Sequence, residues 1–167
     1  MVDVLDADII IAGAGLTGAT LGLAVASAGL KPILVDPQPF DAQVAATFDG
    51  RASAIAFSSF RQWRALGLGE TLAPQAQRIE QILVTDGRGA GAAASNPGPA
   101  YLRFDAAEIA GRLPEDSAEG EPLGYMIENR RSRAALAEAV TRAGLTVLAP
   151  ASVAKVAFGS ADRKSVV

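Results

Sequence analysis

The sequence contains no cysteine and no histidine in its 167 residues. Without cysteine the chain can form neither a disulfide framework nor a thiolate metal site, and without histidine it lacks the commonest general base and zinc ligand. Ser-His-Asp, Cys-His and zinc-hydrolase chemistries are therefore excluded within this chain. We predict no metal site and no catalytic side chain of its own, so any chemistry would have to be supplied by a cofactor.

Charged and aromatic residues are also few, at 20% and 5% of the chain. Fifteen basic and eighteen acidic residues give a formal net charge of −3 and form no dense basic stripe, so nucleic acid is not an expected partner. Half of the residues are hydrophobic, but 35 residues are alanine, so the core has to combine Leu, Val and Ile with much alanine. This length and composition are typical of about one globular domain rather than a disordered chain.

An uncharged run of 22 residues extends from Ile9 to Leu30. It is long enough for a transmembrane helix, but Gly13 and Gly15 would weaken a helix near its beginning. The residues before the run are acidic, whereas a secretory signal begins with positive charge. A strand followed by a tight turn and a helix therefore agrees better with this run than a membrane span or an export signal does.

The run and the residues after it have the pattern of a βαβ unit. Residues 8–12 are predicted to form a buried strand, residues 16–28 a helix that ends at Gly29, and residues 32–36 a second strand. The turn between the first strand and the helix has the spacing G-x-G-x-x-G, which in this context is typical of a dinucleotide-binding site.

Each part of this turn meets a physical requirement of such a site. Gly13 permits a tight turn, Gly15 lets the backbone approach a pyrophosphate, and Gly18 lets the helix pack closely on the strand, while the helix N-terminus offers N–H donors. Asp36, 21 residues after Gly15, can accept hydrogen bonds from an adenosine ribose. The alternative is that the small residues serve only helix–sheet packing. The predicted cofactor-binding residues are Gly13, Ala14, Gly15, Leu16, Thr17, Gly18 and Asp36.

The chain beyond the βαβ unit departs from a plain NAD-dependent dehydrogenase. Residues 37–50 contain several helix and strand breakers and are predicted to form a loop, where such a dehydrogenase would continue with a helix and a third parallel strand. A helix over about residues 53–66 is expected next, with Phe57, Phe60 and Trp63 in the core rather than in a substrate stack. The further expected elements are strands at 79–85, 100–104, 145–148 and 153–158, an irregular acidic stretch at 105–121, and a helix over about 130–143.

Three segments carry a resemblance to a known family. Residues 8–36, then Asp49-Gly50-Arg51 with Ala54-Ile55, and then residues 124–130 with Leu136 resemble the flavin-dependent aromatic hydroxylases of ubiquinone biosynthesis. These are the polyprenylphenol hydroxylases, within the p-hydroxybenzoate hydroxylase group. The resemblance covers nearly the whole chain but only the N-terminal part of a family member. Two later elements of the family have no counterpart here, a Gly-Asp motif that holds the flavin ribityl chain and an Asp-Gly element, so we expect a fragment.

The resemblance implies an α/β fold: a Rossmann-like FAD-binding βαβ domain with additional strands of a substrate-side sheet, incomplete in this chain. Residues 1–167 would be the N-terminal part of the FAD-binding domain, with the C-terminal remainder absent. Residues of about 1–75 and 125–150 would form the nucleotide-binding core. Residues of about 76–124 would begin the substrate-side strands.

The resemblance also implies roles for individual residues. The glycine turn would hold the FAD pyrophosphate and Asp36 the adenosine ribose, while Arg51 would lie against the flavin and Asn129 near the cofactor. The alternative for Arg51 is a surface ion pair, and the alternative for Asn129 is the N-cap of the helix that follows it. A solvent-exposed basic face at the start of that helix is expected for Arg130, Arg131 and Arg133.

The activity implied by the resemblance is that of an FAD-dependent monooxygenase. NAD(P)H would be the reducing co-substrate, and a flavin C4a-hydroperoxide would hydroxylate a polyprenylated phenol in ubiquinone biosynthesis, whereas the fragment alone would be inactive. The implied partners are the polyprenyl-phenol substrate, other ubiquinone-biosynthesis proteins, the membrane surface and, for the fragment, further copies of itself. The implied location is the cytoplasm, with peripheral contact at the inner membrane. Two alternatives remain open: an NAD-dependent Rossmann oxidoreductase, and a non-catalytic nucleotide-binding module.

Overall fold

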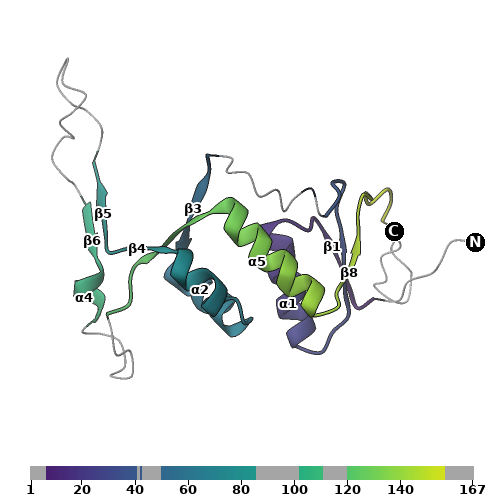
Figure 1. The fold of residues 1–167 in the computed structure, drawn as a ribbon, viewed down its shortest axis with the longest axis horizontal. Helices are drawn as coiled ribbons and strands as arrows, with labels where there is room; N and C mark the ends of the chain where they lie inside the picture. Colours follow the sequence, from purple (N-terminus) through teal and green to yellow (C-terminus); the bar gives the residue numbers. More distant parts are fainter. Residues whose placement is uncertain (1–6, 41, 43–49, 86–101, 111–119, 157–167) are drawn as a thin grey trace, which may run out of the picture.

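The fold consists of a parallel sheet, an antiparallel sheet and a two-stranded ribbon, joined by helices (Figure 1). The computed structural model describes residues 7–40, 42, 50–85, 102–110 and 120–156. The combination of helices with parallel and antiparallel strands confirms the predicted α/β class.

The parallel sheet has the strand order β1 (Ile9–Ala12), β2 (Pro32–Val35) and β8 (Thr146–Leu148). Helix α1 (Leu16–Ser27) connects β1 to β2, so the predicted βαβ unit is present. Every residue of β2 is buried, as is typical of a middle strand in a parallel sheet. Strand β8, from much later in the chain, pairs with the other side of β2. It lies within the strand predicted at 145–148.

The loop predicted over residues 37–50 is described only in part. Residues 37–40 and 50 belong to neither a helix nor a strand, while residue 41 and residues 43–49 lie outside the described part of the chain. The described residues directly after β2 therefore do not supply the third strand of the parallel sheet.

The antiparallel sheet has the strand order β3 (Ala52–Ala56), β7 (Gly124–Glu128) and β4 (Gln77–Ile79). The prediction of a helix over about 53–66 was wrong in its first part, because residues 52–56 form β3 and helix α2 (Phe57–Ala65) begins only after it. Alanine by itself favours a helix, but these residues form a strand because they pair with β7, about 70 residues later in the chain.

The ribbon pairs β5 (Gln81–Val84) with β6 (Leu102–Asp105) and is followed by the short helix α4 (Ala106–Ala110). It projects from one end of the molecule (Figure 1). The single strand predicted at 79–85 is divided at Glu80, with β4 in one sheet and β5 in another. Helix α4 also corrects the expectation that the stretch 105–121 is irregular; residues 111–119 lie outside the described part.

The core lies where helices α1, α2 and α5 (Asn129–Arg142) meet the sheets. Phe60 and Trp63 of α2 are buried and Phe57 is partly buried against the core, which confirms the prediction of these three as core residues. The Trp63 Nε1–H donates a hydrogen bond to Thr20 Oγ1 at 2.9 Å, so the indole is both packed and hydrogen-bonded to α1. Helix α3 (Gly69–Leu72) and a short 3-10 helix, η2 (Ala73–Gln75), follow α2 and place the fully buried Leu72 in the same core.

The last described segment, residues 151–156, belongs to neither a helix nor a strand. The strand predicted at 153–158 is not found, since residues 151–156 belong to no strand and residues 157 and 158 lie outside the described part. The Ala151 N–H instead donates to the Asp36 carbonyl oxygen at 2.8 Å, directly after Pro150. Among the described helices none is both long and apolar enough to cross a membrane.

Candidate functional site

The predicted glycine turn lies between the end of β1 and the start of α1. Gly13 has a φ of +104°, a left-handed conformation that L side chains rarely adopt, and its N–H donates to the Val35 carbonyl oxygen at 2.7 Å. Gly15 is the N-cap residue of α1, and no side chain caps this end or places a carboxylate in its first turn. The first N–H groups of an α-helix have no partner inside the helix, so this end is available to an anion.

The space around the two other glycines of the turn differs sharply. A Cβ added to Gly18 would lie 1.9 Å from the Gly13 carbonyl oxygen, so only glycine lets the helix lie this close to the turn. A Cβ added to Gly15 would meet no atom within 4 Å. A ligand can approach the backbone through the open space in front of Gly15, and a bound pyrophosphate requires such close approach.

Asp36 lies at the carboxyl end of β2, next to the glycine turn. Parallel pairing of β1 and β2 places Ala12 opposite Val35, so the residues after both strands meet at one edge of the sheet. The Ala14 N–H donates to Asp36 Oδ2 at 2.7 Å, and the Gln38 N–H donates to Asp36 Oδ1 at 2.9 Å. Asp36 is only 8% exposed, and through these two hydrogen bonds its carboxylate also holds the turn in place, a role that the sequence spacing did not reveal.

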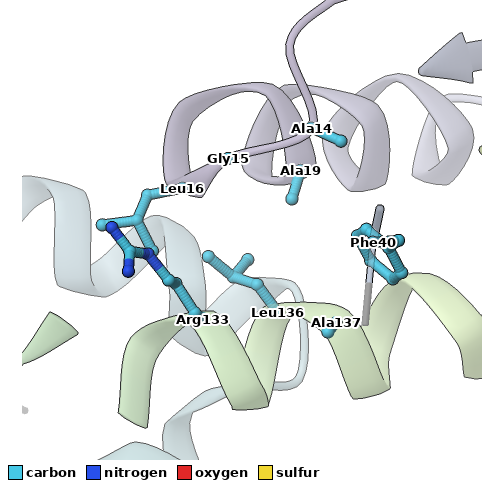
Figure 2. Close-up of a pocket in the computed structure, with 8 residues that line it drawn as sticks. All are labelled: Ala14, Gly15, Leu16, Ala19, Phe40, Arg133, Leu136 and Ala137. Atoms are coloured by element: carbon cyan, nitrogen blue, oxygen red, sulfur yellow. The ribbon is translucent and has the colours of Figure 1, made fainter. Parts of the chain in front are cut away.

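A small pocket lies between the glycine turn and helix α5 (Figure 2). Its cavity volume is only about 10 Å³, room for about one water molecule, whereas a typical ligand pocket has roughly 300–1,000 Å³. The described residues would therefore line only one edge of a dinucleotide site. The residues that line it are Ala14, Gly15, Leu16, Ala19, Phe40, Arg133, Leu136 and Ala137.

The three arginines predicted to form one exposed face of α5 are not equivalent. Arg130 and Arg131 form ion pairs with Glu128 at 2.6 and 3.3 Å, whereas Arg133 lines the pocket. Hydrogen bonding from Arg130, and after it the charge of that residue and the contacts of Arg131, lower the pKa of Glu128 below its ordinary value of 4.5. Arg133 precedes the buried Leu136 by three residues, and that i,i+3 spacing is the sequence signal that could have placed it on the inward side.

Arg51 and Asn129 are brought together by the pairing of β3 with β7. Ala52 is opposite Glu128, and the Asn129 N–H donates to the Arg51 carbonyl oxygen at 3.0 Å. The alternative of Asn129 as an N-cap is wrong, because Glu128 is the N-cap residue and Asn129 is the first residue of α5. Its Oδ1 accepts a hydrogen bond from Ser53 Oγ at 2.6 Å.

Helix α5 links the two groups of candidate residues. Asn129 begins the helix beside Arg51, and Arg133, one turn later, lines the pocket at the glycine turn. Helices α1 and α5 lie side by side (Figure 1). Of the described residues, no group of three or more acidic side chains is placed to hold a metal ion.

Comparison with known proteins finds similarity in sequence and in fold. No protein-family model matches the chain. The ubiquinone hydroxylase UbiL of Rhodospirillum rubrum is 37% identical over 149 residues, which cover 87% of this chain and 30% of that protein. This similarity agrees with the resemblance predicted from the residues, and the chain spans about 30% of the length of that relative.

Solved structures share the fold at lower sequence identity. PqsL from Pseudomonas aeruginosa, described as a probable FAD-dependent monooxygenase, superposes with a TM-score of 0.63 at 14% identity, covering 92% of this chain and 35% of its own. The flavin-dependent monooxygenase PieE, solved with FAD and substrate, has a TM-score of 0.53 at 21% identity, covering 86% of this chain and 23% of its own. The described fold is thus that of the corresponding part of these proteins.

Proposed function

We propose, from the similarity of most of this chain to a curated ubiquinone hydroxylase, that it is the N-terminal FAD-binding part of an FAD-dependent aromatic hydroxylase. One structural observation carries the proposal. The uncapped N-terminus of α1 faces open space at Gly15, beside an aspartate at the end of β2. This arrangement suits a dinucleotide whose pyrophosphate meets backbone N–H groups and whose ribose meets a carboxylate.

In this proposal the chain binds and orients the cofactor. The turn from Gly13 to Gly18 would hold the pyrophosphate, and the Asp36 carboxylate would accept hydrogen bonds from the adenosine ribose. Arg51 and Asn129, adjacent at the start of α5, would contact the flavin half. When bound, FAD would supply the oxygen chemistry, for which a chain without histidine or cysteine has no groups of its own.

The proposed substrate class follows from the similarity to a ubiquinone hydroxylase, and the proposed substrate-side strands include the β5–β6 ribbon. The substrate would be a polyprenylated phenol, with NAD(P)H and O2 as co-substrates. Residues of about 76–124, which include β5 and β6, would begin the substrate-side strands, and the remaining walls would come from elsewhere in the full-length protein. We further propose a cytoplasmic protein with peripheral contact at the inner membrane and with other ubiquinone-biosynthesis proteins.

The topology argues against a plain NAD-dependent dehydrogenase. In such an enzyme the chain after β2 would supply the next parallel strand, whereas here that neighbour of β2 is β8, more than 100 residues later. The other alternative, a non-catalytic nucleotide-binding module, is distinguished from a hydroxylase by the experiment below.

The test uses the full-length gene product, purified without added flavin. We expect a yellow protein that releases FAD on denaturation and consumes O2 with NAD(P)H when a short-chain prenylated phenol is added. Retention of NAD without flavin would refute the proposal. Stoichiometric FAD without O2 consumption across a panel of prenylated and simple phenols would favour the non-catalytic module.

A further inference from the structure

Arg133 on α5 shares a pocket with the glycine turn of α1. Ala14, Gly15 and Leu16 line one side of that pocket and Arg133 the other. Figure 2 shows the Arg133 side chain extending from α5 toward Leu16, in the first turn of α1. We infer that Arg133 is a positioning residue that binds the diphosphate of the dinucleotide from the side opposite the glycine turn. This inference rests on the proposed function.

Among the described residues that line the pocket, the only charge is positive. Apart from Arg133, the lining residues are all uncharged: Ala14, Gly15, Leu16, Ala19, Phe40, Leu136 and Ala137. The N-terminus of α1 adds the positive end of a helix dipole, with no acidic residue in its first turn. A guanidinium can donate two parallel hydrogen bonds to phosphate oxygens, a geometry that an ammonium group cannot reproduce.

The position of Arg133 on α5 distinguishes it from its neighbours. Arg130 and Arg131 pair with Glu128 at the start of the helix and do not line this pocket. Arg133 is four residues after Asn129, so both residues lie on the same side of the helix. Helix α5 would therefore contact the dinucleotide at two places, with Asn129 toward the flavin half and Arg133 at the diphosphate.

The test compares ligands that contain the diphosphate with one that lacks it, in the full-length protein stripped of flavin. FAD binding is followed by quenching of flavin fluorescence, and ADP and adenosine are measured by competition against FAD. We expect Arg133→Gln to weaken FAD and ADP about tenfold, the size of one charge-assisted hydrogen bond, and to leave adenosine unchanged. The loss should diminish at high salt, and Arg133→Lys should restore only part of the affinity.

The matched control is Arg142→Gln, which removes the same charge from the exposed end of α5, where Arg142 pairs with Glu138. Equal affinities of Arg133→Gln and Arg142→Gln for FAD and ADP would overturn the inference while leaving the proposed function intact. An equal loss for adenosine would also overturn it, because a damaged fold would weaken all three ligands. If the wild-type protein binds neither FAD nor ADP, the proposed function fails and this inference with it. Should Arg133→Gln not fold, Arg133→Lys and the salt dependence of wild-type ADP binding decide.

Discussion

At the scale of single residues, the glycine turn separates folding from ligand binding. Gly13 needs its positive φ, and Gly18 needs its missing side chain because the Gly13 carbonyl oxygen lies where a Cβ would be. Gly15 has neither constraint: its φ of −70° suits any residue, and a Cβ there meets only open space. Substitutions at Gly15 and Gly18 should therefore have opposite consequences.

We expect Gly15→Val to abolish flavin retention in the full-length protein and to cost only about 1 kcal/mol of unfolding free energy, the cost of a poor N-cap. The branched side chain would occupy the space that the pyrophosphate needs. Flavin absorbance after gel filtration and thermal unfolding would measure the two effects. As control, Gly18→Ala should lower stability by about 1–3 kcal/mol, because its Cβ meets a backbone oxygen. A yellow Gly15→Val protein with wild-type occupancy would show that the site is misassigned.

Arg51 is expected to act on the cofactor and not on stability. It is exposed directly before β3, so Arg51→Ala should change the unfolding free energy by no more than about 0.5 kcal/mol. The hydroxylation rate of the full-length protein should fall well below that of the wild type, with a shifted flavin spectrum. Arg61→Ala, on the exposed side of α2, controls for loss of a surface charge. An unchanged rate and spectrum would return Arg51 to the alternative of a surface ion pair.

At the scale of elements, the junction of β7 and α5 carries much of the candidate site. Glu128 ends β7, and its carboxylate pairs with Arg130 and Arg131 of α5. The same junction places Asn129 beside Ser53 of β3. The antiparallel pairing of β3 with β7 thus joins the strand after Arg51 to the helix that carries Arg133.

The junction should make a small contribution to acid sensitivity. The pKa of Glu128 is lowered in the folded protein, first by its hydrogen bond from Arg130, so its stabilising effect is present above the unfolded pKa. That effect is lost as the pH falls through the lowered folded pKa, in the range below the ordinary value of 4.5. Urea unfolding of wild type and Glu128→Gln between pH 7 and pH 3 would measure it. The two proteins should converge in stability toward the acid end, and a constant difference would contradict the prediction.

At the scale of the whole molecule, the ribbon of β5 and β6 leaves an apolar surface exposed. Five large side chains, Ile82, Leu83, Val84, Leu102 and Phe104, are each between 43% and 58% exposed. The segment after β8 is the other candidate for an exposed edge, but residues 153–156 form no strand. The ribbon is the better candidate because an exposed apolar edge is a template for pairing with a second chain.

We therefore expect the isolated 167-residue chain to oligomerise, to bind FAD weakly or not at all and to show no NAD(P)H-dependent O2 consumption. Light scattering would give its mass, and Leu83→Lys should shift it toward the monomer. The matched control is Leu30→Lys, which changes a leucine of 44% exposure after α1, away from the ribbon. A clean monomer that binds FAD stoichiometrically would instead favour a complete nucleotide-binding domain.

The sequence by itself determined the βαβ unit, its glycine turn and the position of Asp36. These features depend on contiguous residues: a short apolar strand, glycines at fixed spacing and an acidic residue at the end of the next strand. Parallel pairing of the two strands then brings the turn and the aspartate together without information from elsewhere in the chain. The pattern of α5 was also readable, because its apolar residues repeat at helical spacing.

Only the tertiary structure decided what depends on partners far away in the chain. Residues 52–56 became a strand because β7 pairs with them, and the segment from 77 to 84 was divided between two sheets for the same reason. Asn129 accepts a hydrogen bond from Ser53 instead of capping its own helix. Arg133 lines the pocket because α5 packs on α1. Local spacing specifies which side of a helix a residue occupies, but only docking of the helix specifies what that side contacts.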